Sequence, residues 1–92
     1  MKSIVQGKRE GCFVCGREPT EEHHIFGGVA NRPLSDKYGL TVNLCQYHHR
    51  DSKGGVHFNP ILMVQLKEKG REAFERKYPT LEFERIFIQG LD

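Results

Sequence analysis

The sequence predicts a small α+β domain in which a bound metal supports the core and a long helix follows it. The chain has 92 residues, a length that forms one domain with a limited hydrophobic core. All three cysteines and all five histidines lie in its first part, between Cys12 and His57. Beyond that part, apolar residues recur with the period of an amphipathic helix. We therefore divide one domain, 1–92, into a metal-rich core at 12–59 and a helical extension at 60–92.

The metal-rich core begins with a tight turn at 12–16, where a glycine lets the backbone turn behind two cysteines. Residues 21–26 predict a short strand that ends at a pair of glycines. The stretch 27–39 is rich in residues typical of turns, so we expect a loop there. β-Branched residues and alternation predict a second strand at 40–44. No helix-breaking residue interrupts 45–52, which we expect to form two helical turns.

The extension is predicted to be an amphipathic helix that begins at Pro60. Proline suits a first helical position, and Asn59 before it is a favourable N-cap. Apolar or small residues follow at steps of three and four: Met63, Leu66, Gly70, Phe74 and Tyr78. We expect this helix to end at Pro79 after about five turns. Residues 81–89 fit either a helix or a strand, and we expect a short final helix.

Net charge is only +2, which excludes a strongly basic coat for nucleic acid. Residues 1–59 carry eight basic against six acidic residues, so an anionic partner should meet this part. The chain contains no apolar run of membrane-spanning length, and its N-terminus lacks the apolar stretch of a secretory signal. We therefore expect a cytoplasmic protein without a membrane partner. In that reducing compartment, an odd number of cysteines is better explained by thiolate ligands than by disulfides.

Two ligand pairs with two-residue spacing predict a structural zinc site. Cys12 and Cys15 form the first pair, and Cys45 and His48 form the second. This spacing lets both side chains of a pair reach one ion, and two pairs make a closed tetrahedral site of three sulfurs and one nitrogen. His49 is adjacent to His48 and is an alternative fourth ligand.

The remaining histidines exceed what one zinc ion needs and therefore indicate a second site. His23 and His24 are neighbours, so on a strand they would point to opposite sides. His49 would leave the short helix in a different direction from His48. His57 follows a glycine pair that could return it towards His49. A single histidine is more often inert than functional, but the set beside a zinc site favours a second metal.

Several motifs of the core resemble the HNH nucleases of the ββα-metal (His-Me finger) fold, in their zinc-bearing branch. These motifs are Cys-x2-Cys, Glu22-His23-His24-Ile25, Asn43, and Leu44-Cys45-x2-His48-His49. The longer runs at 23–28, 37–40 and 55–57 are similar to small phage and prophage proteins of that group. The resemblance covers 12–59, about half of the chain.

The resemblance implies a ββα-metal core and an endonuclease that hydrolyses DNA phosphodiester bonds. It implies that His23 and His49 ligate a catalytic divalent ion and that His24 is the general base. The third ligand is either His57 or Asn59. The ion is expected to be magnesium or manganese, with zinc and nickel as alternatives.

The same resemblance implies a second catalytic residue, Asn43, which would steady the loop between the strands. The chemistry is consistent with this set, because a divalent ion stabilises charge on the scissile phosphate and a neutral imidazole deprotonates water near pH 7. Four basic residues of the core are candidates for holding flanking phosphates, although each could equally be a solvated surface charge: Arg32, Lys37, Arg50 and Lys53.

Two other functions stay open at this point. One is a zinc-stabilised nucleic-acid-binding module with an inactive site. The other is a protein-interaction adaptor whose docking face is the helix after Pro60. The expected partner of the nuclease is DNA, joined by a second copy of the chain or a phage protein in a bacterial host cell. The sequence does not distinguish DNA from RNA, nor does it give a target sequence.

Overall fold

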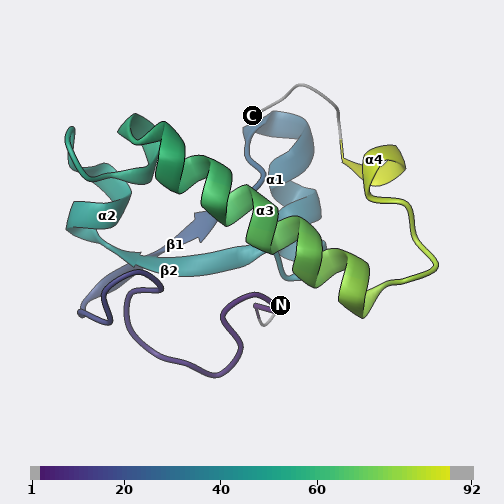
Figure 1. The fold of residues 1–92 in the computed structure, drawn as a ribbon, viewed down its shortest axis with the longest axis horizontal. Helices are drawn as coiled ribbons and strands as arrows, with labels where there is room; N and C mark the ends of the chain where they lie inside the picture. The colour runs from purple at the N-terminus through teal and green to yellow at the C-terminus, as the bar shows by residue number, and fades with distance from the viewer. Residues whose placement is uncertain (1–2, 88–92) are drawn as a thin grey trace.

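The computed structural model describes residues 3–87 and has an α+β architecture, with a two-stranded antiparallel sheet among helices (Figure 1). Figure 1 shows the long helix α3 crossing in front of the sheet, with α1 behind it and α2 beside the end of β2. The elements in chain order are β1 (Thr20–His24), α1 (Gly28–Tyr38), β2 (Thr41–Cys45), α2 (Gln46–Arg50), the 3₁₀ helix η1 (Val56–Phe58), α3 (Pro60–Lys77) and α4 (Phe83–Ile86).

The register of the sheet places two adjacent histidines on opposite faces. His23 pairs with Val42, and His24 pairs with Thr41. Because alternate residues of a strand point to opposite sides, His23 shares a face with Val42 and Leu44, both of which are buried. The side chain of His24 leaves β1 on the opposite face of the sheet. The prediction that the two side chains diverge is therefore confirmed.

The N-terminal segment covers the outer edge of β2. The Ile4 N–H donates to the Gly39 carbonyl at 2.9 Å, and the Phe13 N–H donates to the Asn43 carbonyl at 2.7 Å. The Asn43 N–H in turn donates to Oε1 of Gln6 at 2.7 Å. These bonds satisfy backbone groups that a two-stranded sheet would otherwise leave open. They also bring the Cys12–Cys15 turn next to β2.

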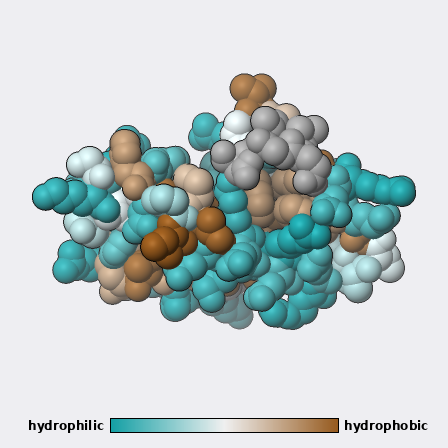
Figure 2. All heavy atoms as spheres, turned by 45° about the horizontal axis from the view of Figure 1, so that its top comes forward, coloured by the Kyte–Doolittle hydropathy of each residue, from teal (hydrophilic) through white to brown (hydrophobic). Residues whose placement is uncertain are grey.

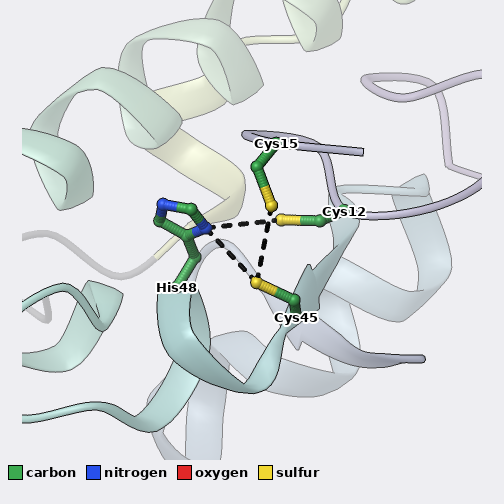
Figure 3. Close-up of side chains that lie close together, drawn as sticks. All are labelled: Cys12, Cys15, Cys45 and His48. Atoms are coloured by element: carbon green, nitrogen blue, oxygen red, sulfur yellow. Dashed lines mark hydrogen bonds between the residues drawn. The ribbon is translucent and has the colours of Figure 1, made fainter. Parts of the chain in front are cut away.

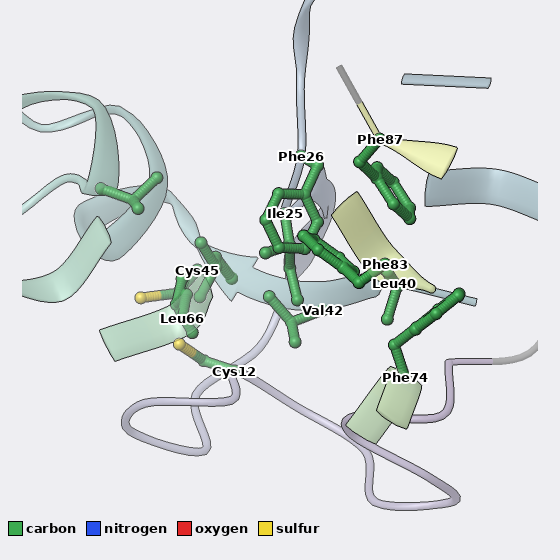
Figure 4. Close-up of a cluster of buried hydrophobic side chains, with 12 residues drawn as sticks. Cys12, Ile25, Phe26, Leu40, Val42, Cys45, Leu66, Phe74, Phe83 and Phe87 are labelled. Carbon is green, nitrogen blue, oxygen red and sulfur yellow. The ribbon is translucent and has the colours of Figure 1, made fainter. Parts of the chain in front are cut away.

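The hydrophobic core lies between the sheet and α3 (Figure 4). Leu66 and Phe74 of α3 are buried in this core, and Met63 is partly buried against it. The apolar stripe that the sequence offered as a docking face therefore packs inward. Gly70 makes this approach close, since a Cβ at that position would lie 3.2 Å from side-chain atoms of both Ile25 and Phe26. Figure 2 shows the hydrophobic side chains of one surface as separate spots among hydrophilic ones.

The loop predicted at 27–39 is wrong, because this stretch forms the helix α1. Its polar residues have partners that the sequence does not reveal. Asn31 and Ser35 are one turn apart and both are buried. The Ser35 hydroxyl donates to the Phe26 carbonyl at 2.8 Å and accepts from the Phe26 N–H at 3.2 Å. Tertiary contacts at the end of β1 therefore override the turn propensity of these residues.

The other predicted elements agree with the structure. Both strands and the short helix α2 lie at their expected places, to within two residues or so at each end. Helix α3 begins at Pro60, and Oδ1 of Asn59 accepts from the Leu62 N–H at 3.1 Å, as an N-cap does. The short final helix is α4, and residues 88–89 of that prediction lie outside the described residues. Among residues 3–87, no helix combines the length and apolar character needed to cross a membrane.

Candidate metal centres

Three cysteines and one histidine converge at one end of the sheet (Figure 3). Cys12 and Cys15 come from the N-terminal turn, Cys45 is the last residue of β2, and His48 lies on α2. The Sγ of Cys45 lies 3.3 Å from Nδ1 of His48 and 3.6 Å from the Sγ of Cys15. The Sγ of Cys12 lies 3.7 Å from the same Nδ1. This Cys3His group is the set predicted from the spacing, with His48 rather than His49 as its nitrogen.

The geometry of the Cys3His group fits a tetrahedral metal. Bonds of about 2.3 Å to sulfur imply ligand atoms about 3.7 Å apart, close to the distances found here. Burial alone raises the pKa of the Cys12 thiol, but hydrogen bonds from the backbones of Cys45, Cys15 and Val14 outweigh it and bring the pKa to about 6. A thiolate at Cys12 is the form that binds a metal. The group is therefore compatible with a closed structural site for an ion such as zinc.

Three histidines form a second group on the core-facing side of the sheet. His23 belongs to β1, His49 to α2 and His57 to η1. Their ligand atoms all lie within 4.8 Å of one another, and the ring centroids are 5.3–5.4 Å apart. Since a metal–nitrogen bond is about 2.1 Å, small side-chain rotations would bring the three nitrogens onto one ion.

The surroundings of the three-histidine group favour the neutral form of His23 and His57 and orient His49. Burial, aided by the neighbouring His49 and His57, lowers the pKa of His23 to about 4. Burial also lowers the pKa of His57. An Oε1 atom of Glu21 accepts from Nδ1 of His49 at 2.8 Å, which leaves Nε2 of that ring for a metal. Neutral rings with a fixed tautomer are what a divalent ion requires of histidine.

Glu21 is itself held by a basic residue. Its Oε1 atom accepts from Nε of Arg50 at 2.7 Å. Hydrogen bonds from Arg50 and His49 lower the pKa of Glu21, and the same carboxylate raises the pKa of Arg50. Because this pair is exposed, we expect it to orient His49 rather than to contribute much stability.

His24 stands outside the three-histidine group and has a carboxylate partner of its own. Its Nε2 lies 2.8 Å from Oδ1 of Asp36 on α1 and 3.9 Å from Oε1 of Glu22. In this short contact the Asp36 carboxylate accepts from the Nε2–H group of His24, so Nδ1 is the ring nitrogen left to accept a proton. This arrangement is the one in which a histidine accepts a proton from water.

A cavity of about 580 Å³ is bordered by His24 and by two members of the three-histidine group. Its lining residues are His23, His24, Ile25, Gly27, Gly28, Val29, Ala30, His57, Met63 and Lys67. Two of the three candidate ligands, His23 and His57, therefore border the same space as the candidate base. A polar reactant in that space would be within reach of a metal on one side and of an imidazole on the other.

Other residues predicted to act at the site lie elsewhere. Asn43 faces Glu22 in the sheet, on the side away from His23, and its backbone rather than its side chain has the hydrogen bonds described above. Asn59, the alternative metal ligand, caps α3 instead of approaching the histidines. Arg32 and Lys37 are exposed residues of α1, not of a loop. Lys53 is also exposed, and its backbone N–H donates to Oδ1 of Asp51.

Three residues near the histidines had no signal in the sequence. Asp36 and Glu21 become partners of His24 and His49 only when α1 and α2 pack beside β1. Lys67 lies on α3 outside the apolar pattern of that helix, and it lines the cavity beside His23. The carboxylate partners of His24 and His49 cannot be identified from the sequence, because they are 12 and 28 residues away along the chain.

No family model, curated protein or solved structure matches this chain. Within residues 3–87, three groups of side chains have the geometry to hold a metal ion. The third of these consists of Glu22, His24 and Asp36, and both of its carboxylate residues are exposed. Function is therefore inferred from the Cys3His group, the three histidines and the cavity beside them.

Proposed function

We propose that the protein is a metal-dependent endonuclease that hydrolyses DNA phosphodiester bonds, with structural zinc in the Cys3His group. One observation carries this proposal. His23, His49 and His57 converge as three ligands, while His24 borders the same cavity and bonds to Asp36. Three protein ligands leave coordination positions for a substrate and are typical of catalytic rather than structural sites.

The roles of the residues follow from their positions. A divalent ion at His23, His49 and His57 would supply charge stabilisation for a phosphate oxygen and for the departing 3′ oxygen. Asp36 holds Nε2 of His24, so that Nδ1 accepts the proton of the attacking water. Glu21 holds His49 in the tautomer that a metal needs.

The order of the elements supports the HNH resemblance. The first histidine of the pair lies on β1 and His49 lies on the helix after β2, which agrees with a strand–strand–helix metal motif. The third ligand of the proposal is His57, because Asn59 is engaged as a cap. Asn43 takes no part in the proposed reaction. Its backbone groups instead form hydrogen bonds that hold the N-terminal segment along β2.

The proposal predicts that His24→Ala abolishes cutting without loss of metal. We expect nicking of supercoiled plasmid by the wild-type protein with magnesium or manganese, and a rate at least about 100-fold lower for His24→Ala, because general base catalysis contributes that much. Calorimetric titration with manganese should give the same affinity for both proteins. His23→Ala should instead lose manganese binding as well as cutting.

The matched control is Gln65→Ala, an exposed change on α3 outside the cavity and both metal groups. It should cut at the wild-type rate. Cutting by His24→Ala at that same rate would show that His24 is not the base and would contradict the proposed mechanism.

A zinc-stabilised nucleic-acid-binding module without cleavage is the second candidate. The position of Asn43, away from the three histidines, favours it. This candidate predicts DNA binding that weakens steeply with salt and no cutting with any divalent ion tested. Gel-shift titrations at two salt concentrations beside the plasmid assay separate the two candidates.

A further inference from the structure

The cavity beside the histidines has two chemically different sides. Its polar side presents His23 and His57 from the metal group and Lys67 from α3. Its apolar side presents Ile25 from the end of β1 and Met63 from α3. At about 580 Å³, it lies in the size range of sites that bind small organic molecules.

The polar side of the cavity favours an anion. Lys67 brings a positively charged side chain to the same cavity lining as His23 and His57. The N-terminus of α1 borders the same space through Gly28, Val29 and Ala30, and no side chain caps it. Uncapped N–H groups and the helix dipole add positive potential to that of Lys67 and of an ion on the histidines. His23, which is only 8% exposed, is directed into this environment.

The apolar side of the cavity leaves room for a flat, weakly polar group. A Cβ added at Gly27 or at Gly28 would have no atom within 4 Å, so the backbone there borders open space. Met63 offers a flexible thioether surface that packs well against an aromatic ring. Among the common ligands, a nucleotide combines an anionic phosphate with such a ring.

We propose that this cavity binds one unstacked nucleotide, with its phosphate towards Lys67 and the histidines and its base against Met63 and Ile25. This inference rests on the proposed nuclease function, which supplies the phosphodiester. A base within a duplex cannot enter the cavity without leaving the stack, which costs free energy that an unpaired base does not lose. The enzyme therefore acts preferentially on single-stranded or locally unpaired DNA.

Methyl resonances provide a direct test of nucleotide binding. The chain has two methionines, and Met63 is the one that lines the cavity, so Met1 serves as an internal reference. Zinc-loaded protein with labelled methionine methyl groups is titrated with the dinucleotide thymidylyl-thymidine, without magnesium or manganese. The Met63 signal should shift and saturate, whereas the Met1 signal should not move. A dinucleotide with one abasic residue should bind about tenfold more weakly, since stacking of a base contributes that much.

Two pairs of variants locate the two ends of the nucleotide. Ala30→Leu fills part of the cavity and should weaken dinucleotide binding, whereas Gln65→Leu, at an exposed position outside it, should not. Lys67→Gln should weaken both dinucleotide and inorganic phosphate, whereas Lys69→Gln on the exposed side of α3 should weaken neither. The first control introduces the same leucine side chain outside the cavity, and the second removes the same positive charge from the exposed side of α3.

A cleavage assay on matched single-stranded and duplex oligonucleotides completes the test. Faster cutting of the single strand, with this preference reduced in Ala30→Leu, would support the nucleotide site. Equal cutting of both forms with an unmoved Met63 signal would overturn the site and leave the nuclease standing. No cutting of either form, with a saturable Met63 shift, would overturn the nuclease and leave the nucleotide site standing. Equal shifts with the abasic dinucleotide would overturn the site.

Discussion

His23 is the residue on which the proposed chemistry and the fold both depend. It lies on the core-facing side of β1, opposite Val42, and is almost completely buried. Burial there costs a charged imidazole far more than a neutral one, which is why its pKa falls to about 4. The burial that keeps His23 neutral, and therefore able to bind a metal, also lowers the stability of the folded protein at acid pH.

The stability of the fold should fall as the pH falls from about 6.5 to 4. In this window the unfolded chain binds a proton at His23, whose ordinary pKa is 6.5, while the folded chain does not. The unfolded state is favoured by up to about 3 kcal/mol at the acid end, and the contribution is absent above pH 7. The lowered pKa of His57 also reduces the stability of the folded protein as the pH falls.

Urea unfolding at a series of pH values, with zinc present, measures this effect. The control is His23→Gln, which keeps a polar side chain but cannot titrate. The wild-type protein should lose more unfolding free energy across the window than the variant does. Parallel curves for the two proteins would show that His23 is not held neutral by the fold.

At the scale of elements, the turn between α2 and η1 decides whether the three histidines meet. It carries the chain from His49 to His57 within eight residues. The Gly55 N–H donates to the Asp51 carbonyl at 2.8 Å, and a Cβ at Gly55 would lie 2.5 Å from that same oxygen. Only glycine allows this close approach of backbone to backbone.

Gly55→Ala should therefore lower stability and weaken the three-histidine site. Backbone atoms of Asp51 have to move, and we expect a loss of about 1–3 kcal/mol in unfolding free energy with weaker manganese binding. Thermal unfolding and calorimetric titration measure the two effects. Gly27→Ala is the control for stability, because a Cβ there meets no atom within 4 Å. A Gly55→Ala protein as stable as Gly27→Ala would contradict this account of the turn.

At the scale of the whole molecule, the Cys3His group joins the N-terminal segment to β2 and α2, in addition to the hydrogen bonds between that segment and β2. Two of its ligands lie in the N-terminal segment, whereas Cys45 and His48 lie on β2 and α2. The core of a chain this short provides limited stability by itself. A metal in this group would therefore hold the N-terminal segment along the edge of the sheet.

Removal of structural zinc should unfold much of the protein. Binding free energies of about 10–16 kcal/mol for structural zinc are comparable with the whole stability of a small domain. We expect a strong zinc chelator to abolish the cooperative thermal transition seen by circular dichroism, and Cys45→Ser to do the same. His49→Ala, which leaves the Cys3His group intact, should keep its transition. An unchanged transition in protein shown by mass spectrometry to lack zinc would contradict a structural role for the group.

Much of the fold could be predicted because it depends on local patterns. The paired spacing of Cys12 with Cys15 and of Cys45 with His48 identified their group, and Asn59 with Pro60 located the start of α3. Helix α1 could not be predicted, because its turn-forming residues are stabilised by contacts with Phe26. The position of Asn43 on the sheet face away from His23 could not be predicted either, since it depends on the pairing of the strands.

Local patterns along the chain were enough to show which neighbouring residues could act as ligand pairs. The tertiary structure decided which distant residues meet: His57 with His23, Asp36 with His24, and Lys67 with the cavity between them. The physical reason is the range of the interactions. Spacing and helical period act over a few residues, whereas a metal ion or a carboxylate partner requires atoms within a few ångströms, whatever their separation in the chain.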